Sequence, residues 1–276
     1  MKFIYLVLVY NKKIINSTTL QTLLSSNVNF SSSKLIIWNN GPTSISLEIE
    51  DTIREAWQSI ELIQTLDNKP LSYIYNKVID TYSADRYVLL DDDSQLTEEY
   101  LNAVSNTQAA IAVPAIYSEG DFRSPTVRGV FNPGPYSNTD TVIAIGSGIS
   151  VSQDIVQKIK SHYGDVFDSR FALYGVDTTF FLRLYHQGLS NRVQSIDGFE
   201  HSLSRLEIES KPMSHFRQVE RAYDFGLVMR HYMPRSLAMF ILFKKVIKFL
   251  IGRLSWVQIK IIFKAYMSGC HPRCRS

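Results

Sequence analysis

Three consecutive carboxylates, Asp91, Asp92 and Asp93, follow a short apolar segment at residues 87–90. Adjacent anions repel one another, so such a cluster needs water, hydrogen bonds or a cation to offset the repulsion. Carboxylate oxygens suit Mg²⁺ and Mn²⁺, which usually keep several waters and share their coordination with substrate phosphates. The triplet therefore predicts a divalent metal site. The alternative is a solvated acidic turn before a helix that begins near Thr97.

Asp177 and His201 also have side chains that can do chemistry. Asp177 falls in the first turn of a predicted helix, where an Asp commonly caps the helix or offsets its dipole. An Asp can also act as a general base. His201 follows the last predicted strand, where a His is more often a plain polar residue, although beside carboxylates it can bind a metal. Position along the chain leaves both pairs of alternatives open.

Alternating strands and helices position the carboxylate triplet. Apolar runs predict strands at 3–9, 34–38, 60–65 and 87–90, and helical patterns predict helices at 14–24, 45–57 and 71–82. This alternation is typical of an α/β fold with a mostly parallel central sheet flanked by helices. Ligands collect beyond the carboxyl ends of such strands. We therefore expect one crevice to hold Tyr10 with Asn11, Asn39 with Asn40, and the triplet at 91–93.

The second half of the chain repeats the mixture of strands and helices less regularly. We expect strands at 109–113, 141–150 and 191–196, and helices at 152–162 and from about 176 to Gly188. Residues 117–138 are rich in Pro and Gly and predict a long loop with room for a short hairpin. The glycines at 146 and 148 fall where a strand must let another group approach its backbone.

The charge of the chain is unevenly distributed. Its 276 residues are 45% hydrophobic and 20% charged, which excludes a disordered or wholly membrane-embedded protein. The first 224 residues carry a net charge of −7, whereas the last 52 contain ten Lys and Arg, no Asp or Glu, and a net charge of +10. The N-terminal apolar run stops at Asn11 with no cleavage site after it, so we interpret it as a strand.

The basic tail alternates large apolar residues with lysines at 237–250 and 256–266. Neither uncharged run approaches the roughly 20 residues that cross a bilayer. Basic amphipathic helices lie on anionic membrane surfaces, so we expect this extension to bind one; packing on the body or on a second subunit is the alternative. Cys270 and Cys274 form one local pair, which is weak evidence for zinc or a disulfide and favours a reducing compartment.

The order of these motifs resembles that of the family 2 inverting glycosyltransferases of GT-A fold, in the rhamnosyltransferase-like branch. The resemblance covers residues 3 to about 230. The motifs that carry it are Val-Tyr-Asn at 9–11, Ile-Ile-Trp-Asn-Asn-Gly at 36–41, Asn76, Leu-Leu-Asp-Asp-Asp-Ser at 89–94, Gly-Ser-Gly at 146–148, Gly-Val-Asp-Thr-Thr-Phe-Phe-Leu-Arg-Leu at 175–184, His-Ser-Leu at 201–203 and His-Phe-Arg at 215–217.

Three departures bear on this resemblance. Asn39 stands where the family has an Asp that contacts the base, and Thr179 stands where it has a Glu two residues after the catalytic Asp. Residues 218–225 match the Tyr-Tyr-X-X-Arg-Asn run of the rhamnosyltransferase-like branch poorly, so the identity of the donor sugar is left open.

The resemblance implies metal-dependent transfer of a sugar, with inversion, from a nucleoside diphosphate to a saccharide acceptor. Asp177 is then the general base, and Asp91, Asp93 and His201 hold Mg²⁺ or Mn²⁺. The nucleotide-sugar donor is held by Tyr10, Asn11, Asn39, Asn40, Asn76, Asp91 and Asp92, with Asp92 mattering least to the metal.

The same resemblance divides the chain into a nucleotide-sugar-binding half at 1–115, an acceptor-binding half at 116–205 and a helical extension at 206–276. Together with the basic tail, it suggests a lipid-linked or free acceptor in the assembly of a bacterial surface polysaccharide. The expected location is the cytoplasm, at the inner face of the membrane, and we expect no nucleic-acid partner.

Two other functions fit parts of the sequence. A haloacid dehalogenase-type phosphatase also places an aspartyl nucleophile and its acid partner after an apolar strand, but that motif normally closes the first strand, and three predicted strands precede Asp91. A membrane-peripheral binding protein that keeps the fold without turnover is favoured by Thr179.

Overall fold

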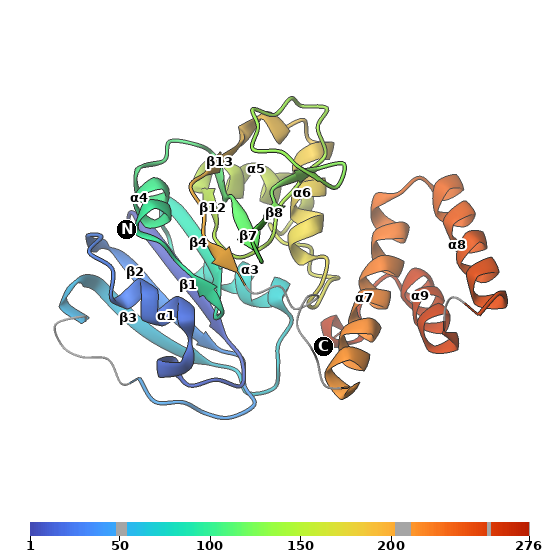
Figure 1. Ribbon diagram of the computed structural model, residues 1–276, viewed down its shortest axis with the longest axis horizontal. Helices are drawn as coiled ribbons and strands as arrows, with labels where there is room; N and C mark the ends of the chain where they lie inside the picture. The colour runs from blue at the N-terminus through green and yellow to red at the C-terminus, as the bar shows by residue number, and fades with distance from the viewer. Residues whose placement is uncertain (48–53, 202–210, 253–254, 276) are drawn as a thin grey trace.

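The central element of the computed structural model is a seven-stranded sheet in the order β13-β6-β12-β4-β1-β2-β3 (Figure 1). The structure describes residues 1–47, 54–201, 211–252 and 255–275. Strand β12 runs antiparallel to β4 and β6, and the other neighbours are parallel, which confirms the predicted mostly parallel α/β sheet. The strands are β1 (Phe3–Val9), β2 (Phe30–Asn39), β3 (Trp57–Gln64), β4 (Arg86–Asp91), β6 (Ile111–Pro114), β12 (Ile149–Ser152) and β13 (Val193–Ile196).

Helices cover both faces of this sheet because its strands are apolar on both sides. Successive side chains of a strand point to opposite faces. Accordingly, Ile4 and Leu6 of β1 belong to one apolar cluster, and Tyr5 and Val7 belong to another. The first cluster includes α3 (Leu71–Thr81), α5 (Gln153–Tyr163) and α6 (Val176–His186), and the second includes α1 (Thr18–Leu24) and α4 (Glu98–Asn106). The result is three layers with a core on each side of the sheet.

The registers of the first strands bring their carboxyl ends together. In the parallel pairs, Val9 of β1 lies opposite Asn39 of β2, and Leu8 lies opposite Asp91 of β4. The polar residues that follow these strands therefore meet at one edge of the sheet, as the alternating pattern predicted. The short helix η1 (Ile14–Asn16) and α1 follow β1 directly, and Ser17 at the start of α1 donates a hydrogen bond to the carbonyl oxygen of Asp92 at 2.9 Å.

Among the described residues, the predicted helix at 45–57 is present only at residues 54 and 55. Residues 48–53 lie outside the described residues, residues 44–47 have no regular structure, and Trp57 begins β3. The Trp57 ring stacks on Phe30 with centroids 4.0 Å apart, so β2 also begins at Phe30, four residues earlier than predicted. Packing between two distant aromatic residues outweighs local propensity here.

The predicted strand at 141–150 is two short strands, β11 (Val142–Ile143) and β12, with a turn between them. Gly148 has φ +84°, and a Cβ there would lie 2.7 Å from Pro114 and 2.8 Å from Phe199. The expected hairpin is present as β7 (Ile116–Ser118) and β8 (Asp121–Ser124). The small sheets around it also contain β5 (Ser94–Gln95), β9 (Thr126–Val127), β10 (Val130–Phe131) and β14 (Glu200–His201).

The C-terminal extension is helical, as predicted. It consists of α7 (Lys211–Tyr232), α8 (Arg235–Leu250) and α9 (Trp256–Ser268), and it stands to one side of the sheet in Figure 1. Gly226 allows α9 to approach α7, since a Cβ there would lie 2.5 Å from the carbonyl oxygen of Ile262. The predicted boundary between residues 205 and 206 lies outside the described residues. Two short helices, η2 (Ser190–Arg192) and η3 (Pro272–Cys274), complete the fold.

Candidate active site

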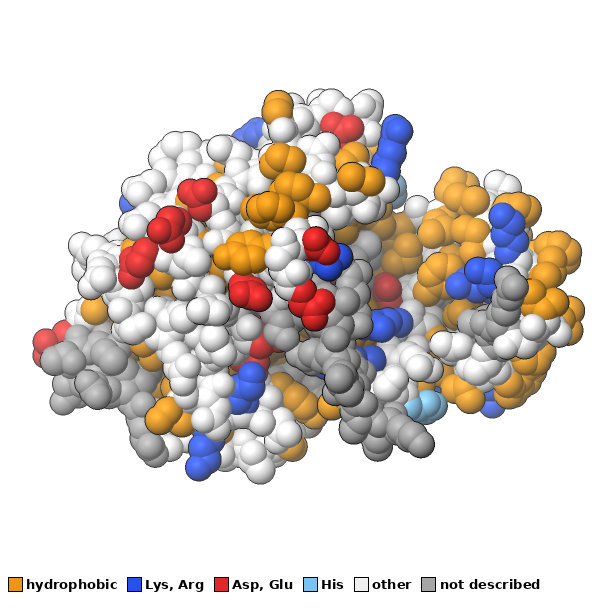
Figure 2. All heavy atoms as spheres, in the orientation of Figure 1, with side chains coloured by type: hydrophobic (Ala, Val, Ile, Leu, Met, Phe, Trp, Pro, Cys, Tyr) orange, Lys and Arg blue, Asp and Glu red, His pale blue; other side chains and the backbone are white. Residues whose placement is uncertain are grey.

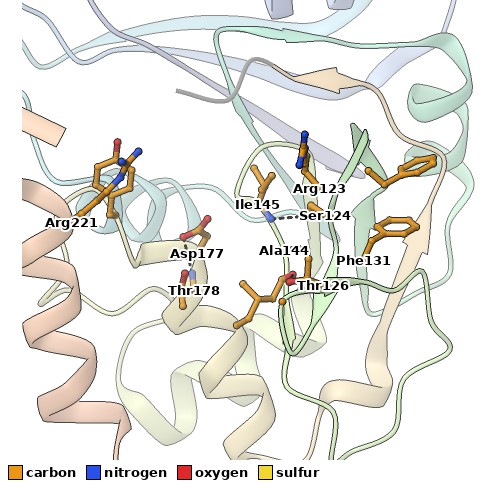
Figure 3. A pocket seen from close by; sticks show the side chains of 13 residues that line it. Arg123, Ser124, Thr126, Phe131, Ala144, Ile145, Asp177, Thr178 and Arg221 are labelled. Atoms are coloured by element: carbon orange, nitrogen blue, oxygen red, sulfur yellow. Dashed lines mark hydrogen bonds between the residues drawn. The ribbon is translucent and has the colours of Figure 1, made fainter. Parts of the chain in front are cut away.

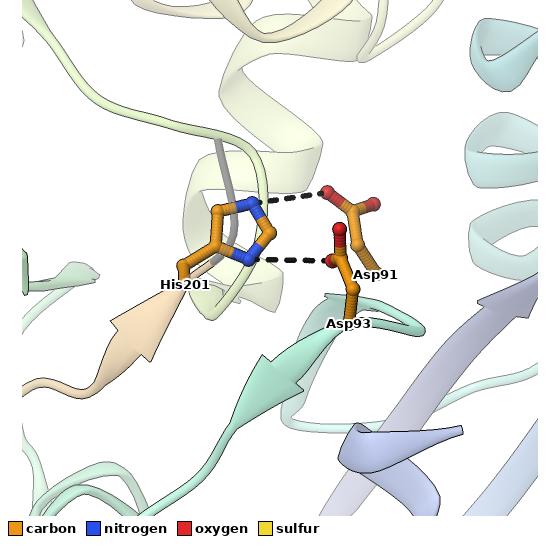
Figure 4. Close-up of side chains that lie close together, drawn as sticks. All are labelled: Asp91, Asp93 and His201. Carbon is orange, nitrogen blue, oxygen red and sulfur yellow. Dashed lines mark ion pairs between the residues drawn. The ribbon is translucent and has the colours of Figure 1, made fainter. Parts of the chain in front are cut away.

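Asp91, Asp93 and His201 converge at the carboxyl edge of the sheet. The chain turns after β4, and β5 then pairs with β14 so that Ser94 lies opposite His201. In Figure 4 the His201 ring faces both carboxylates, with Nδ1 3.3 Å from Asp93 Oδ1 and Nε2 4.0 Å from Asp91 Oδ2. One ligand atom from each of the three residues lies within 4.8 Å of the others. The group therefore has the donor set and spacing for a divalent cation.

The electrostatics of this group also fit a cation. Burial, followed by the charges of Asp93, Asp92 and Asp177, raises the pKa of Asp91 above its ordinary value. Burial likewise raises the pKa of Asp93. Asp93 Oδ1 is buried and accepts no hydrogen bond, which is costly for a carboxylate. A divalent cation would offset both the repulsion among these carboxylates and the cost of burying them.

Two serines fix the orientation of the group. Ser94 Oγ lies 3.0 Å from His201 Nδ1 and 2.7 Å from Ser147 Oγ, and Ser147 Oγ accepts a hydrogen bond from the Asp91 amide at 3.0 Å. Ser147 precedes Gly148, which has a left-handed backbone conformation and lies between Pro114 and Phe199, where a larger residue would not fit. Ser94 was not predicted as a site residue, and only its place directly after the triplet could have indicated it.

Asp92 is directed away from the other two carboxylates. It accepts a hydrogen bond from Lys12 Nζ at 2.6 Å and another from the backbone amide of Tyr10 at 3.3 Å. Its carboxylate therefore joins the end of β4 to the loop after β1. Sequence reasoning did not single out Lys12, which is 80 residues from Asp92.

A cavity of about 640 Å³ opens over this edge of the sheet; we call it the carboxylate cavity. Tyr10, Asn40 and the triplet all contribute to its wall, so the structure brings these predicted residues together. Asn11 follows Tyr10 and is exposed, with φ +51°. The complete lining is Leu8, Tyr10, Lys12, Asn40, Asn68, Leu71, Asp91, Asp92, Asp93, Leu173, Tyr174, Met213, Phe216, Arg217 and Arg273.

The amides of Asn39 and Asn40 hold the turn after β2. Asn39 donates to the Thr43 carbonyl at 2.8 Å and to Gln64 Oε1 at 3.0 Å, and its Oδ1 accepts the Gly41 amide at 3.0 Å. Asn40 Oδ1 accepts the Lys69 amide at 2.9 Å. Both residues are buried, so their side chains determine the shape of this wall of the cavity.

Asn76 serves a different part of the molecule. Its amide donates to the Phe167 carbonyl at 2.7 Å and accepts the Phe167 amide at 3.0 Å. These two bonds fix the start of the loop that leads to Tyr174, Gly175 and Asp177. Asn76 does not line the carboxylate cavity.

Asp177 lies in the first turn of α6 and lines a second cavity of about 510 Å³, the Asp177 cavity (Figure 3). Burial raises its pKa, against hydrogen bonds that include the Thr178 amide, 2.7 Å from Oδ1. The stacked rings of Phe122 and Phe131, 4.6 Å apart, lie on the far wall, and Arg221 reaches in from α7. Tyr174 lines both cavities, so the two meet at its side chain.

Asp224 of α7 is a second carboxylate near Asp177 that the sequence did not reveal. A Cβ on Gly175, which has φ +83°, would lie 2.0 Å from Asp224 Oδ1, so only glycine fits there. This oxygen is buried with no hydrogen-bond partner, and burial together with the charge of Asp177 raises the pKa of Asp224 to about 7. In the sequence, Asp224 falls in the segment at 218–225, which matches the Tyr-Tyr-X-X-Arg-Asn run of the rhamnosyltransferase-like branch poorly.

Comparison with known proteins establishes the fold. No protein-family model matches the sequence, and no curated protein sequence matches it. Among solved structures, S. aureus TarS 1-349 in complex with UDP-GlcNAc is 10% identical, with a TM-score of 0.53, over 99% of this chain and 83% of that one. A longer TarS structure is 12% identical, with a TM-score of 0.55, over 98% and 43%.

A third TarS structure, again of TarS 1-349, is 11% identical, with a TM-score of 0.52, over 83% of this chain and 64% of that one. The chain thus corresponds to less than two thirds of that structure. At such identities the likeness concerns the fold alone. The chain has the GT-A fold, with a group of two Asp and one His, suited to a metal ion, at the carboxyl edge of its sheet.

Proposed function

We propose that the chain is a metal-dependent glycosyltransferase that moves a sugar from a nucleoside diphosphate to a saccharide acceptor. The observation that carries this proposal is the convergence of Asp91, Asp93 and His201 at the edge of a GT-A sheet. The two Asp of this group line a cavity large enough for a nucleotide. The UDP-GlcNAc bound in one TarS structure supports a nucleotide-sugar donor. Assignment to family 2 and to its rhamnosyltransferase-like branch is part of the proposal and rests on the motif order.

The charges that line the carboxylate cavity explain why a metal is needed. Lys12, Arg217 and Arg273 match the three carboxylates of the triplet in number, so the wall alone offers a diphosphate no net positive charge. Mg²⁺ or Mn²⁺ held by Asp91, Asp93 and His201 supplies two positive charges and stabilises the leaving diphosphate. Tyr10 and Asn11 then contact the base and ribose, while Asn39 and Asn40 act by shaping the turn beside them.

Asp177 is the general base in this proposal. The acceptor hydroxyl oxygen attacks the anomeric carbon, the bond from that carbon to the diphosphate breaks, and the hydroxyl proton passes to the Asp177 carboxylate. The two cavities meet at Tyr174, which supports approach of donor and acceptor from different sides and hence inversion. Asn76 contributes indirectly, since it fixes the loop that precedes Asp177.

We further propose that α8 and α9 bind an anionic membrane surface that presents a lipid-linked acceptor of surface polysaccharide assembly. Phe243, Leu250 and Trp256 are 63%, 74% and 62% exposed, and lysines lie among them. Figure 2 shows hydrophobic side chains gathered over these helices, interspersed with Lys and Arg. Within the described residues, no helix is both long and apolar enough to cross a membrane. The proposal therefore locates the protein at the inner face of the cytoplasmic membrane.

One assay tests the proposed transfer. The protein is incubated with UDP-GlcNAc and a panel of other nucleotide sugars, with Mn²⁺ or Mg²⁺, and released nucleoside diphosphate is measured. We expect release that requires the metal and is abolished by Asp93→Ala, whereas Asp154→Ala, at an exposed Asp on α5, retains it. Hydrolysis of simple phosphate esters would instead favour the phosphatase. No turnover with any donor would favour a binding protein without activity.

A further inference from the structure

The last residues of the chain fold back onto the body instead of continuing away from it. Gly269, with φ +69°, ends α9, and its carbonyl oxygen lies 2.8 Å from His231 Nε2. The His271 amide donates to the carbonyl oxygen of Arg170 at 3.0 Å. Figure 1 accordingly shows the C-terminus between α7 and the sheet. We call residues 269–275 the C-terminal strap.

Glu220 of α7 anchors the strap through two side chains. Its carboxylate lies 2.8 Å from Arg273 Nη2 and 3.4 Å from His271 Nε2, and it is buried. Burial opposes ionisation of Glu220, but His271 and Arg273 hold its pKa below the ordinary value. An ionised, buried carboxylate fixes the Arg273 guanidinium strongly. The position of Arg273 is therefore set by the fold before any ligand binds.

Arg273 brings this fixed guanidinium to the wall of the carboxylate cavity, beside Asn68. Of its five N–H groups, one on Nη2 is bonded to Glu220 and one on Nη1 to the Asn68 carbonyl at 3.3 Å. Nε is buried with no acceptor. The side chain lines the cavity and is 26% exposed, and one N–H on each Nη is left to donate to a ligand. A planar fork of this kind matches phosphate oxygens.

We propose that Arg273 binds a phosphate oxygen of the nucleoside diphosphate, so that the extreme C-terminus supplies part of the donor site. This inference rests on the proposed function, because it assigns a contact within the same site. It also gives the strap a role separate from the membrane-binding surface of α8 and α9. Arg273 then adds positive charge to the wall of the cavity.

Binding measurements on the full-length chain test this contact. UDP, GDP, CDP, ADP and dTDP are each titrated with Mn²⁺ by calorimetry, and the tightest binder is compared with its own nucleoside. We expect Arg273→Gln to weaken the diphosphate about tenfold or more, because a charge-assisted contact is lost, and to leave the nucleoside affinity unchanged. Arg275→Gln is the matched control, since Arg275 is exposed in the same strap, and it retains the wild-type affinity for both.

The inference is overturned if Arg273→Gln binds the diphosphate as tightly as the wild type. It is also overturned if the variant loses the same affinity for diphosphate and nucleoside, because Arg273 would then only support the turn at Asn68. If the Gln variant does not fold, Arg273→Lys is tested in its place. This variant keeps a positive charge for Glu220 but loses the planar guanidinium, so wild-type affinity for the diphosphate would again overturn the inference. If the wild-type protein binds none of the five diphosphates, the proposed function itself fails, which is a distinct result.

Discussion

Asp177 is a carboxylate held among apolar groups at the start of a helix. Burial favours its neutral form, and the hydrogen bond from the Thr178 amide favours the charged one. Burial is the larger effect, so its pKa lies above the ordinary 3.8. A base whose pKa is raised toward the working pH accepts a proton more readily.

This balance predicts how turnover depends on pH. Asp177 must be ionised to act, so kcat falls as the pH decreases through its pKa, and this acid limb lies above pH 3.8. Asp177→Asn should lower kcat by about 10²–10⁴-fold, the usual contribution of a general base. Nucleoside diphosphate affinity should be retained, since Asp177 does not line the carboxylate cavity. Steady-state kinetics check both, and an Asn variant with more than about a tenth of the wild-type kcat would argue against the assignment.

Residue types and order on the chain were enough to predict which side chains meet at the metal group. The partners of those side chains were not predictable, because they depend on tertiary contacts. Lys12 reaches Asp92 across 80 residues, and Arg273 reaches Asn68 across 205. Asp224 comes near Asp177 only because α7 packs against α6 and Gly175 leaves room. No local pattern in the sequence records such a contact.

At the scale of elements, the turn between β11 and β12 supports the metal group. Gly148 donates from its amide to the Leu89 carbonyl at 2.6 Å, and its own carbonyl accepts the Tyr100 hydroxyl at 3.0 Å. The preceding residue, Ser147, holds the amide of Asp91. Any displacement of this turn therefore reaches the metal ligands.

Gly148→Ala should lower the free energy of unfolding by about 2–4 kcal/mol, as strain at positive φ adds to overpacking against Pro114 and Phe199. Gly164→Ala is the matched control. Gly164 also has φ +84°, but nothing lies within 4 Å of its Cβ position, so only the strain of about 1–2 kcal/mol applies. Urea unfolding measures both variants. Equal losses would mean that the close approach at Gly148 contributes nothing.

Hydrophobic periodicity predicted most helices and strands because their apolar faces belong to one of two continuous cores. It failed at both ends of 45–57: residues 45–47 have no regular structure, and the Phe30–Trp57 stack makes Trp57 part of a strand. It failed again at 141–150, where an apolar run is interrupted by a turn that glycine makes feasible. In both places a long-range contact decides the local conformation.

At the scale of the molecule, the helical extension combines two surfaces. The strap after α9 returns to the carboxylate cavity, whereas α8 and α9 present exposed aromatic and aliphatic side chains with lysines. Truncation at residue 235 would remove both the strap and the exposed face of α8 and α9. Substitutions on that exposed face therefore test membrane binding separately from the strap.

Flotation with vesicles tests this membrane proposal. We expect the protein to bind vesicles of phosphatidylcholine with about 30% phosphatidylglycerol and to bind pure phosphatidylcholine weakly, because each basic residue near an anionic surface contributes about 1 kcal/mol. Phe243→Ser with Leu250→Ser should reduce binding at least tenfold through lost apolar burial. Ile15→Ser, at a residue 72% exposed on η1, is the control and changes nothing. Unchanged binding of the double variant, or concentration-dependent dimerisation in its place, would favour packing against a second copy.

The proposed transfer depends most on the ability of Asp91, Asp93 and His201 to hold a divalent cation. Electron paramagnetic resonance of Mn²⁺ measures this directly as the fraction of metal bound by the protein. We predict one bound Mn²⁺ per wild-type chain and at least about tenfold weaker binding in Asp93→Asn and in His201→Asn, since each removes a ligand. Asp92→Asn, whose carboxylate faces Lys12, should change the affinity least. Wild-type Mn²⁺ binding by Asp93→Asn would contradict the metal site and the transfer mechanism built on it.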